Sequence, residues 1–100
     1  YDINYVVNGF DGELNRIATL YHEGTGRSMD VLTTQPGVQL YTSNNVDGIR
    51  GKEGIVYNKY AAVCLETQHF PDTPNQQLFP STVIHPGDEY QQVTIYRFKW

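Results

Sequence analysis

The sequence lacks the features by which several classes of protein are recognised. Its only cysteine, Cys64, allows no disulfide within the chain, so nothing argues for an oxidising compartment. It has no cluster of lysine and arginine, and its formal net charge of −4 makes nucleic acid and anionic membranes poor partners. No apolar run approaches the roughly 20 residues of a membrane-spanning helix, and no signal peptide is indicated. We therefore expect a soluble, cytoplasmic protein.

Motifs for metals, cofactors and nucleophilic catalysis are also missing. The three histidines, His22, His69 and His85, are far apart in the sequence, and without a cysteine pair they give no local support for a zinc site. No glycine-rich loop precedes a helix to hold a phosphate, and no Gly-x-Ser-x-Gly turn is present. We therefore expect neither a metal nor a cofactor.

What is present is the pattern of β-strands. Residues 14–22 and 28–34 alternate in the manner of strands and flank a glycine-containing turn, which predicts a hairpin. Further strands are expected at 38–42, 61–68 and 91–100, and no helical period of useful length occurs. Strands separated by turn residues favour an all-β fold, an antiparallel β-sandwich, and 100 residues suffice for one domain at most.

The same pattern leads to expectations about burial. The strand at 14–22 carries mostly apolar, aromatic or β-branched residues on both sides, so we expect both of its faces to be covered. In the last strand the aromatic side, which includes Tyr96 and Phe98, is expected to face the core. Residues 43–60 are rich in Asn and Gly and are expected to form a long surface loop.

One carboxylate stands out by its position. Glu66 follows the apolar run 61–65 and precedes the proline-punctuated stretch 69–80, so it lies where a strand opens into a loop. Partial desolvation at such a place makes a carboxylate a better base at neutral pH, although the residue could also simply point to water. Carboxylates and amides such as Asp2, Gln39 and Gln68, interleaved with aromatic rings, suit the hydroxyl groups and apolar faces of a sugar.

Several longer motifs carry a resemblance to a known family. Residues 33–42 read TTQPGVQLYT, residues 64–72 read CLETQHFPD, and FPS at 79–81 is followed by PGDEY at 86–90. In this order they closely resemble the C-terminal part of aldose 1-epimerases, the galactose mutarotase family. The opening residues 1–5 are similar to the family's Asp-His-Asn-Phe/Tyr element, with Ile3 in place of the histidine. The resemblance covers essentially the entire chain.

The resemblance implies a function and a set of site residues. Glu66 matches the general base that takes the proton from the anomeric hydroxyl of a hexose such as galactose or glucose, and Asp2 and Gln39 match residues that hydrogen-bond the sugar. The reaction is ring opening and reclosure by acid and base, which requires no cofactor. Residues 1–100 correspond to the C-terminal portion of a mutarotase-like β-sandwich domain.

The resemblance also implies that something is missing. The family's acid histidine lies upstream of the matched region, so we expect this segment alone to be inactive. Its partner would be the N-terminal remainder of the domain, as a second chain or a preceding segment, and apolar faces should be exposed without it. The chain begins at Tyr1 and its only methionine is Met29, which fits a processed piece, a fragment or one part of a longer protein.

Two other interpretations remain open at this point. The chain could belong to a non-catalytic sugar-binding or regulatory protein that kept the mutarotase scaffold. Alternatively, Asp2 and Glu66 could be the carboxylate pair of a glycosidase, which requires them to flank a glycosidic bond at a separation of about 5–9.5 Å. The family's closed pocket for a monosaccharide argues against the second alternative.

Overall fold

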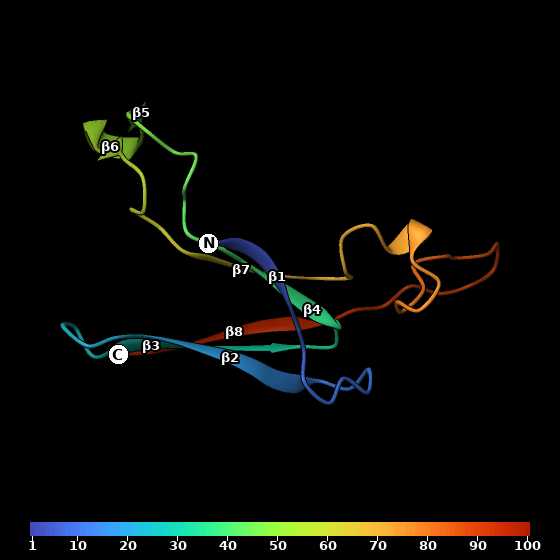
Figure 1. Cartoon of the computed structure of the whole chain (residues 1–100). Coiled ribbons are helices and arrows are strands. Elements are labelled where there is room, and N and C mark those ends of the chain that lie inside the picture. Colours follow the sequence, from blue (N-terminus) through green and yellow to red (C-terminus); the bar gives the residue numbers. More distant parts are fainter.

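A computed structural model describes all 100 residues, and the regular structure is almost entirely antiparallel β-sheet (Figure 1). The first three-stranded sheet, sheet A, has the strand order β1 (Asp2–Val6), β4 (Gly37–Tyr41), β7 (Cys64–Gln68). The second, sheet B, has the order β2 (Asn15–His22), β3 (Arg27–Thr33), β8 (Thr94–Lys99). The all-β, antiparallel sandwich expected from the sequence is confirmed.

The two sheets lie over one another (Figure 1). Side chains from β7 and β8 join them. The Thr67 hydroxyl lies 2.6 Å from that of Thr94, and the Tyr96 hydroxyl donates a hydrogen bond to the Leu65 carbonyl oxygen at 2.8 Å. Val38 of β4 lines the space between the two sheets and is only 7% exposed. Sheet A therefore has one face directed toward sheet B and one directed away from it.

Burial is concentrated where the chain passes from one sheet to the other. Of the nine buried residues, seven lie between Asp30 and Val38. β3 and β4 are the central strands of their sheets, and residues 34–36 connect them directly, so this segment has neighbours on both sides. Thr33 and Thr34 connect this segment to Val93 through hydrogen bonds of 3.1 and 3.0 Å. The core of this chain is thus the crossing between the two central strands.

Outside this core the molecule is open. A compact monomer of this mass, 11.4 kDa, exposes about 5,800 Å² of surface, whereas the chain exposes 7714 Å². Its radius of gyration is 16.4 Å, compared with about 13 Å for a compact domain of 100 residues. Large apolar side chains remain in solvent as a result; Phe98 is 63% exposed and Trp100 is 94% exposed.

One expectation about burial is wrong for this chain, and another holds only in part. The strand β2 is not covered on both faces, since most of its residues are exposed. The aromatic side of β8 is directed toward sheet A, where the Tyr96 hydroxyl contacts Leu65, but Phe98 on the same side stays exposed. The reason is visible in Figure 1, where the two sheets diverge toward the end at which β8 terminates. Sequence alternation identified the apolar side of each strand correctly, but the chain holds nothing to cover it there.

The strand predictions hold in outline and differ in detail. The hairpin of β2 and β3 is confirmed, but β7 begins at Cys64 rather than at Ala61. Residues 43–60 are more than a loop, because β5 (Ile49–Arg50) pairs with β6 (Val56–Tyr57) around the short helix Lys52–Gly54. This arm extends away from both sheets (Figure 1). The other short helix is Thr73–Asn75, and neither helix has the length or apolar character needed to cross a membrane.

A buried carboxylate ties the three strands of sheet B together. Asp30, in the central strand, is only 4% exposed; it accepts hydrogen bonds from the Thr19 hydroxyl at 2.7 Å and from Lys99 Nζ at 3.0 Å. Arg16 adds a weaker ion pair at 3.9 Å. The Thr19 hydrogen bond, followed by that of Lys99, holds the pKa of the Asp30 carboxyl below its ordinary value of 3.8.

This arrangement predicts a pH dependence of stability. Because the pKa of Asp30 is lower in the folded than in the unfolded chain, its contribution is complete above the ordinary value of 3.8 and is lost as the pH falls through the lowered pKa. We expect Asp30→Asn to lower the melting temperature at neutral pH and to flatten the decline of stability below about pH 4. Thermal unfolding followed by circular dichroism at a series of pH values measures both effects.

The matched control is Asp47→Asn, because Asp47 is exposed and lies in the arm. Its pH profile should equal that of the unmodified protein. An Asp30→Asn profile that also equals it would contradict the role assigned to Asp30.

Candidate functional site

Sheet A has a polar face and an apolar face, because residue character alternates along its strands. Val38 and Leu40 of β4, together with Leu65 of β7, line the space between the two sheets. Gln39 of β4 and Glu66 of β7 are the intervening residues and therefore point to the opposite face. The same backbone thus supplies core residues to one side and polar side chains to the other.

The register of the sheet brings the three predicted site residues together. Gln39 lies opposite Glu66 in the neighbouring β7 and opposite Asn4 in β1 on its other side, while Asp2 is paired with Tyr41. They line an open hollow of about 430 Å³, whose residues are Asp2, Gln39, Tyr41, Asn45, Glu66, Gln68 and Pro71. Residues 2, 39 and 66 of the sequence are therefore neighbours on one surface.

Hydrogen bonds connect the amide side chains of this surface in a row. Gln39 Nε2 donates to Asp2 Oδ1 at 2.7 Å, and Gln39 Oε1 accepts from Gln68 Nε2 at 3.3 Å. Gln68 Nε2 also donates to Asn4 Oδ1 at 3.0 Å. The row runs from β1 across β4 to β7 and returns to β1, so all three strands of sheet A contribute to it.

Glu66 stands apart from this row. Its side chain makes none of the side-chain hydrogen bonds of the chain, and the residue is exposed. The expected partial desolvation is therefore not present within these 100 residues, because β7 is an edge strand and the hollow beside Glu66 is open. Both carboxylate oxygens remain available to a ligand in the hollow.

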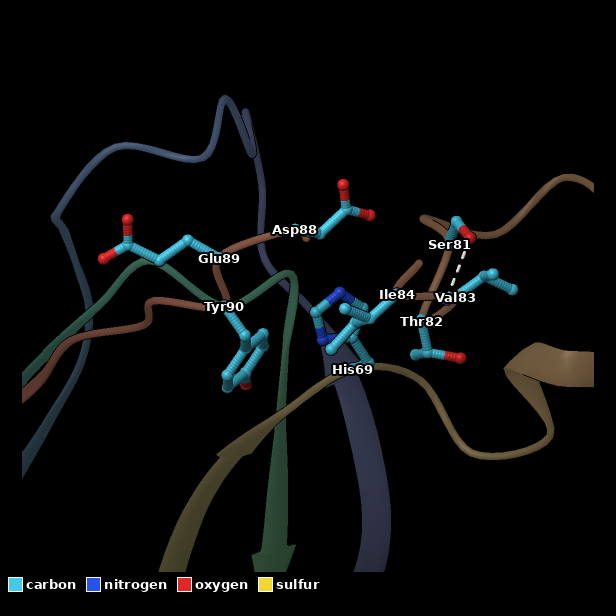
Figure 2. A pocket seen from close by; sticks show the side chains of 8 residues that line it. All are labelled: His69, Ser81, Thr82, Val83, Ile84, Asp88, Glu89 and Tyr90. Atoms are coloured by element: carbon cyan, nitrogen blue, oxygen red, sulfur yellow. Dashed lines mark hydrogen bonds between the residues drawn. The ribbon is translucent and has the colours of Figure 1, made fainter. Parts of the chain in front are cut away.

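None of the three histidines lines this hollow. His22 Nδ1 lies 3.0 Å from the Thr25 hydroxyl in the β2–β3 turn, and His85 Nδ1 lies 3.4 Å from Asp88 Oδ2 on an exposed turn. His69 follows the end of β7 and lines a separate cavity of about 570 Å³ (Figure 2). The chain therefore offers Glu66 no histidine partner.

The cavity beside His69 is formed by the loop at residues 81–90. In Figure 2 the carboxylates of Asp88 and Glu89 point away from the imidazole ring, so neither acts as its partner. The hydroxyl of Tyr90 is occupied by a hydrogen bond from Gln35 Nε2 at 3.2 Å. This cavity lacks the convergence of polar groups found on the polar face of sheet A.

Sequence reasoning did not identify Asn4, Tyr41 and Asn45 as members of the site. A signal for the first two existed, since Asn4 is two residues from Asp2 and Tyr41 two residues from Gln39, an offset that keeps side chains on one face of a strand. Asn45 lies beyond the end of β4, and its backbone N–H donates to the Tyr41 hydroxyl at 3.1 Å. Alternation along a strand carries no information about that contact.

Gly37 provides the space in which Asn4 lies. A Cβ atom at this position would stand 2.8 Å from Asn4 Oδ1 and 3.0 Å from a ring carbon of Phe70. Both separations are shorter than normal carbon contacts, so a larger residue would displace the Asn4 carboxamide. The hydrogen bond from Gln68 to Asn4 thus depends on a glycine in the neighbouring strand.

We expect Gly37→Ala to disturb the site more than the fold. The added methyl group displaces the flexible end of Asn4, while a reduced entropy of the unfolded chain offsets the strain, so the free energy of unfolding should change by less than about 1 kcal/mol. The side-chain amide resonances of Asn4 and Gln68 should shift in ¹H–¹⁵N spectra. The control Gly24→Ala, in the β2–β3 turn, should leave them in place; unchanged resonances in Gly37→Ala would contradict the prediction.

Comparison with known proteins places this geometry in context. The sequence model of the family "Aldose 1-epimerase" matches residues 1–97. The chain is 44% identical to human galactose mutarotase over 99 residues and 46% identical to the bovine protein over 101 residues. It is 32% identical over 102 residues to the aldose 1-epimerase of Haemophilus influenzae.

The matches cover nearly all of this chain but only a small part of each relative. The three alignments include 98%, 92% and 99% of this chain but only 29%, 30% and 29% of the respective relatives. The chain thus spans less than a third of the length of the curated relatives it matches.

Proposed function

Because the chain belongs to the aldose 1-epimerase family, we propose that residues 1–100 are the C-terminal portion of an enzyme that interconverts the α and β anomers of a hexose. Galactose or glucose is the proposed substrate. The observation that supports this function is the convergence of Asp2, Gln39 and Glu66 on the polar face of sheet A, around one hollow.

In the proposed mechanism, Glu66 is the general base. Its carboxylate takes the proton of the C1 hydroxyl group while the bond between C1 and the ring oxygen O5 breaks and O5 gains a proton from an acid. Rotation about the C1–C2 bond and reclosure, with both proton transfers reversed, give the other anomer. Asp2 and Gln39 hold the sugar by hydrogen bonds, and orientation with proton transfer suffices without a metal or cofactor.

The acid in this mechanism is a histidine from outside the chain. No histidine of these 100 residues lines the hollow, and Ile3 occupies the place of the histidine in the family's Asp-His-Asn element. Ile3 is also on the apolar side of β1, opposite to its neighbours Asp2 and Asn4. The segment therefore supplies the base and part of the sugar-binding surface, and it is inactive by itself.

The proposed source of this histidine is the N-terminal remainder of the same domain, as a second chain or as a preceding segment. Its support is the surface that the chain leaves exposed, about 1,900 Å² more than a compact monomer of its mass. This excess is more than twice the roughly 800 Å² that each partner buries in a standard interface. A remainder that covers the divergent ends of the two sheets would also enclose Glu66 and exclude water from the hollow.

Replacement of Glu66 by Gln tests the role of the base. In the complete enzyme we expect Glu66→Gln to lower kcat by at least about a hundredfold, since the amide cannot accept the proton, while the hexose still binds. Polarimetry of freshly dissolved α-galactose or α-glucose measures the rate, and calorimetry measures binding. A variant with unchanged kcat would contradict the assignment of Glu66.

The incomplete site predicts a second result. The isolated 100 residues should catalyse mutarotation at less than about one hundredth of the rate of the complete enzyme. The reason is that general acid catalysis contributes at least about a hundredfold to that rate. Addition of the separately prepared N-terminal remainder should restore activity if the two parts associate. Mutarotation by the isolated chain at the rate of the complete enzyme would contradict both the missing acid and the missing partner.

The alternative function is sugar binding without catalysis, in a regulatory protein of the same family. Ile3 stands in place of the family's histidine, and this departure from the family's pattern lies next to Asp2. The departure favours the alternative function. Binding of hexose by the complete protein without any acceleration of anomer exchange would decide for this alternative. A cytoplasmic location stays a prediction under either function.

A further inference from the structure

We propose that Gln68 is a positioning residue that, anchored by Asn4, fixes the direction of the Gln39 carboxamide and thereby decides which hydrogen bonds the site offers to a sugar. The proposal deepens the function proposed above and rests on it. Neither Gln68 nor Asn4 is assigned a role in the mechanism itself. The row of hydrogen bonds on sheet A has one charged end, the Asp2 carboxylate.

The Asp2 carboxylate sets the direction of the row. An ionised carboxylate can only accept hydrogen bonds, so the group that approaches Asp2 Oδ1 at 2.7 Å must be the amino end of the Gln39 carboxamide. The reverse orientation would bring Gln39 Oε1 against the carboxylate, and two acceptors repel at this distance. In the favourable orientation Gln39 Oε1 is directed along the row, where it needs a donor.

Gln68 supplies that donor and is itself held in place. One N–H group of Gln68 Nε2 is directed to Gln39 Oε1 at 3.3 Å, and the other to Asn4 Oδ1 at 3.0 Å. Both donors of this amino group are thereby used, which leaves its carboxamide a single orientation. Asn4 and Gln68 are half-buried, whereas Asp2 at the other end of the row is exposed, so the anchoring end of the row is the better packed end.

The fixed row leaves a defined set of free groups in the hollow. Gln39 retains one N–H donor, Asp2 retains Oδ2 as an acceptor, and Glu66 retains both carboxylate oxygens. A sugar hydroxyl can accept from the Gln39 donor and donate its own proton to a flanking carboxylate. Without Gln68, the Gln39 carboxamide would lose the partner of its oxygen and could rotate, so its remaining N–H donor would no longer be held in one direction.

The test compares two substitutions on adjacent residues of β7 in the complete enzyme. Gln68→Met preserves the approximate volume but removes both N–H donors, and we expect the KM for galactose or glucose to rise about tenfold, the effect of one net hydrogen bond, with kcat changed by less than about twofold. Thr67→Val is the matched control, because Thr67 faces sheet B and contacts Thr94. It should lower the melting temperature and leave KM unchanged.

Substitutions of Asn4 separate hydrogen bonding from packing. Asn4→Asp keeps an acceptor for Gln68 and should keep KM within about threefold of the unmodified enzyme, whereas Asn4→Leu removes the acceptor and should raise KM as Gln68→Met does. If the role of Asn4 were purely structural, KM would instead rise in each variant in proportion to the loss of melting temperature. Equal KM values for Asn4→Leu and the unmodified enzyme would overturn the proposal.

A measurement without substrate distinguishes this proposal from the function on which it rests. In ¹H–¹⁵N spectra of the sugar-free protein, Gln68→Met should shift the side-chain amide resonances of Gln39, and Thr67→Val should not. Unchanged Gln39 resonances in Gln68→Met would overturn the positioning role even in an active enzyme. If the unmodified protein neither binds nor converts hexoses, the proposed function fails, and shifted Gln39 resonances would still support the fixed carboxamide.

Discussion

The antiparallel register of β4 with its two neighbours is the constraint on which the site depends. Gln39 lies in the central strand of sheet A, so its position determines what stands on either side of it, Asn4 in β1 and Glu66 in β7. Because side chains alternate with a period of two, a slip by one residue would direct the polar side chains toward sheet B and the apolar ones toward solvent. Core and site are therefore specified by the same pairing.

The crossing between the two central strands supports that register. Residues 34–36 lead from β3 directly into β4, and this region contains most of the buried residues of the chain. Gly37, at the start of β4, brings Asn4 and Phe70 close to the backbone. The best-packed part of the molecule thus lies at the beginning of the strand that carries Gln39, and the polar face of sheet A extends from it toward more exposed edges.

The exposed surfaces explain why several expectations from the sequence were wrong. Both β2 and β8 have apolar side chains that the chain does not cover, and Glu66 is not partly desolvated as its sequence position suggested. Sequence patterns describe the environment that a residue requires, whereas the structure shows the environment that these 100 residues supply. The difference between the two is the basis for proposing that another part of the domain covers the hollow and contributes the acid.

The sequence by itself determined the all-β class, the hairpin of β2 and β3, the alternation in each strand and the candidate residues Asp2, Gln39 and Glu66, because these depend on local periodicity and on motifs. Only the tertiary structure decided that the three residues share one face, that Asn4 and Gln68 join them, and that no histidine of the chain does. The pairing of Gln39 with Asn4 and with Glu66 joins residues 35 and 27 positions apart, and no local pattern encodes which of such distant strands become neighbours.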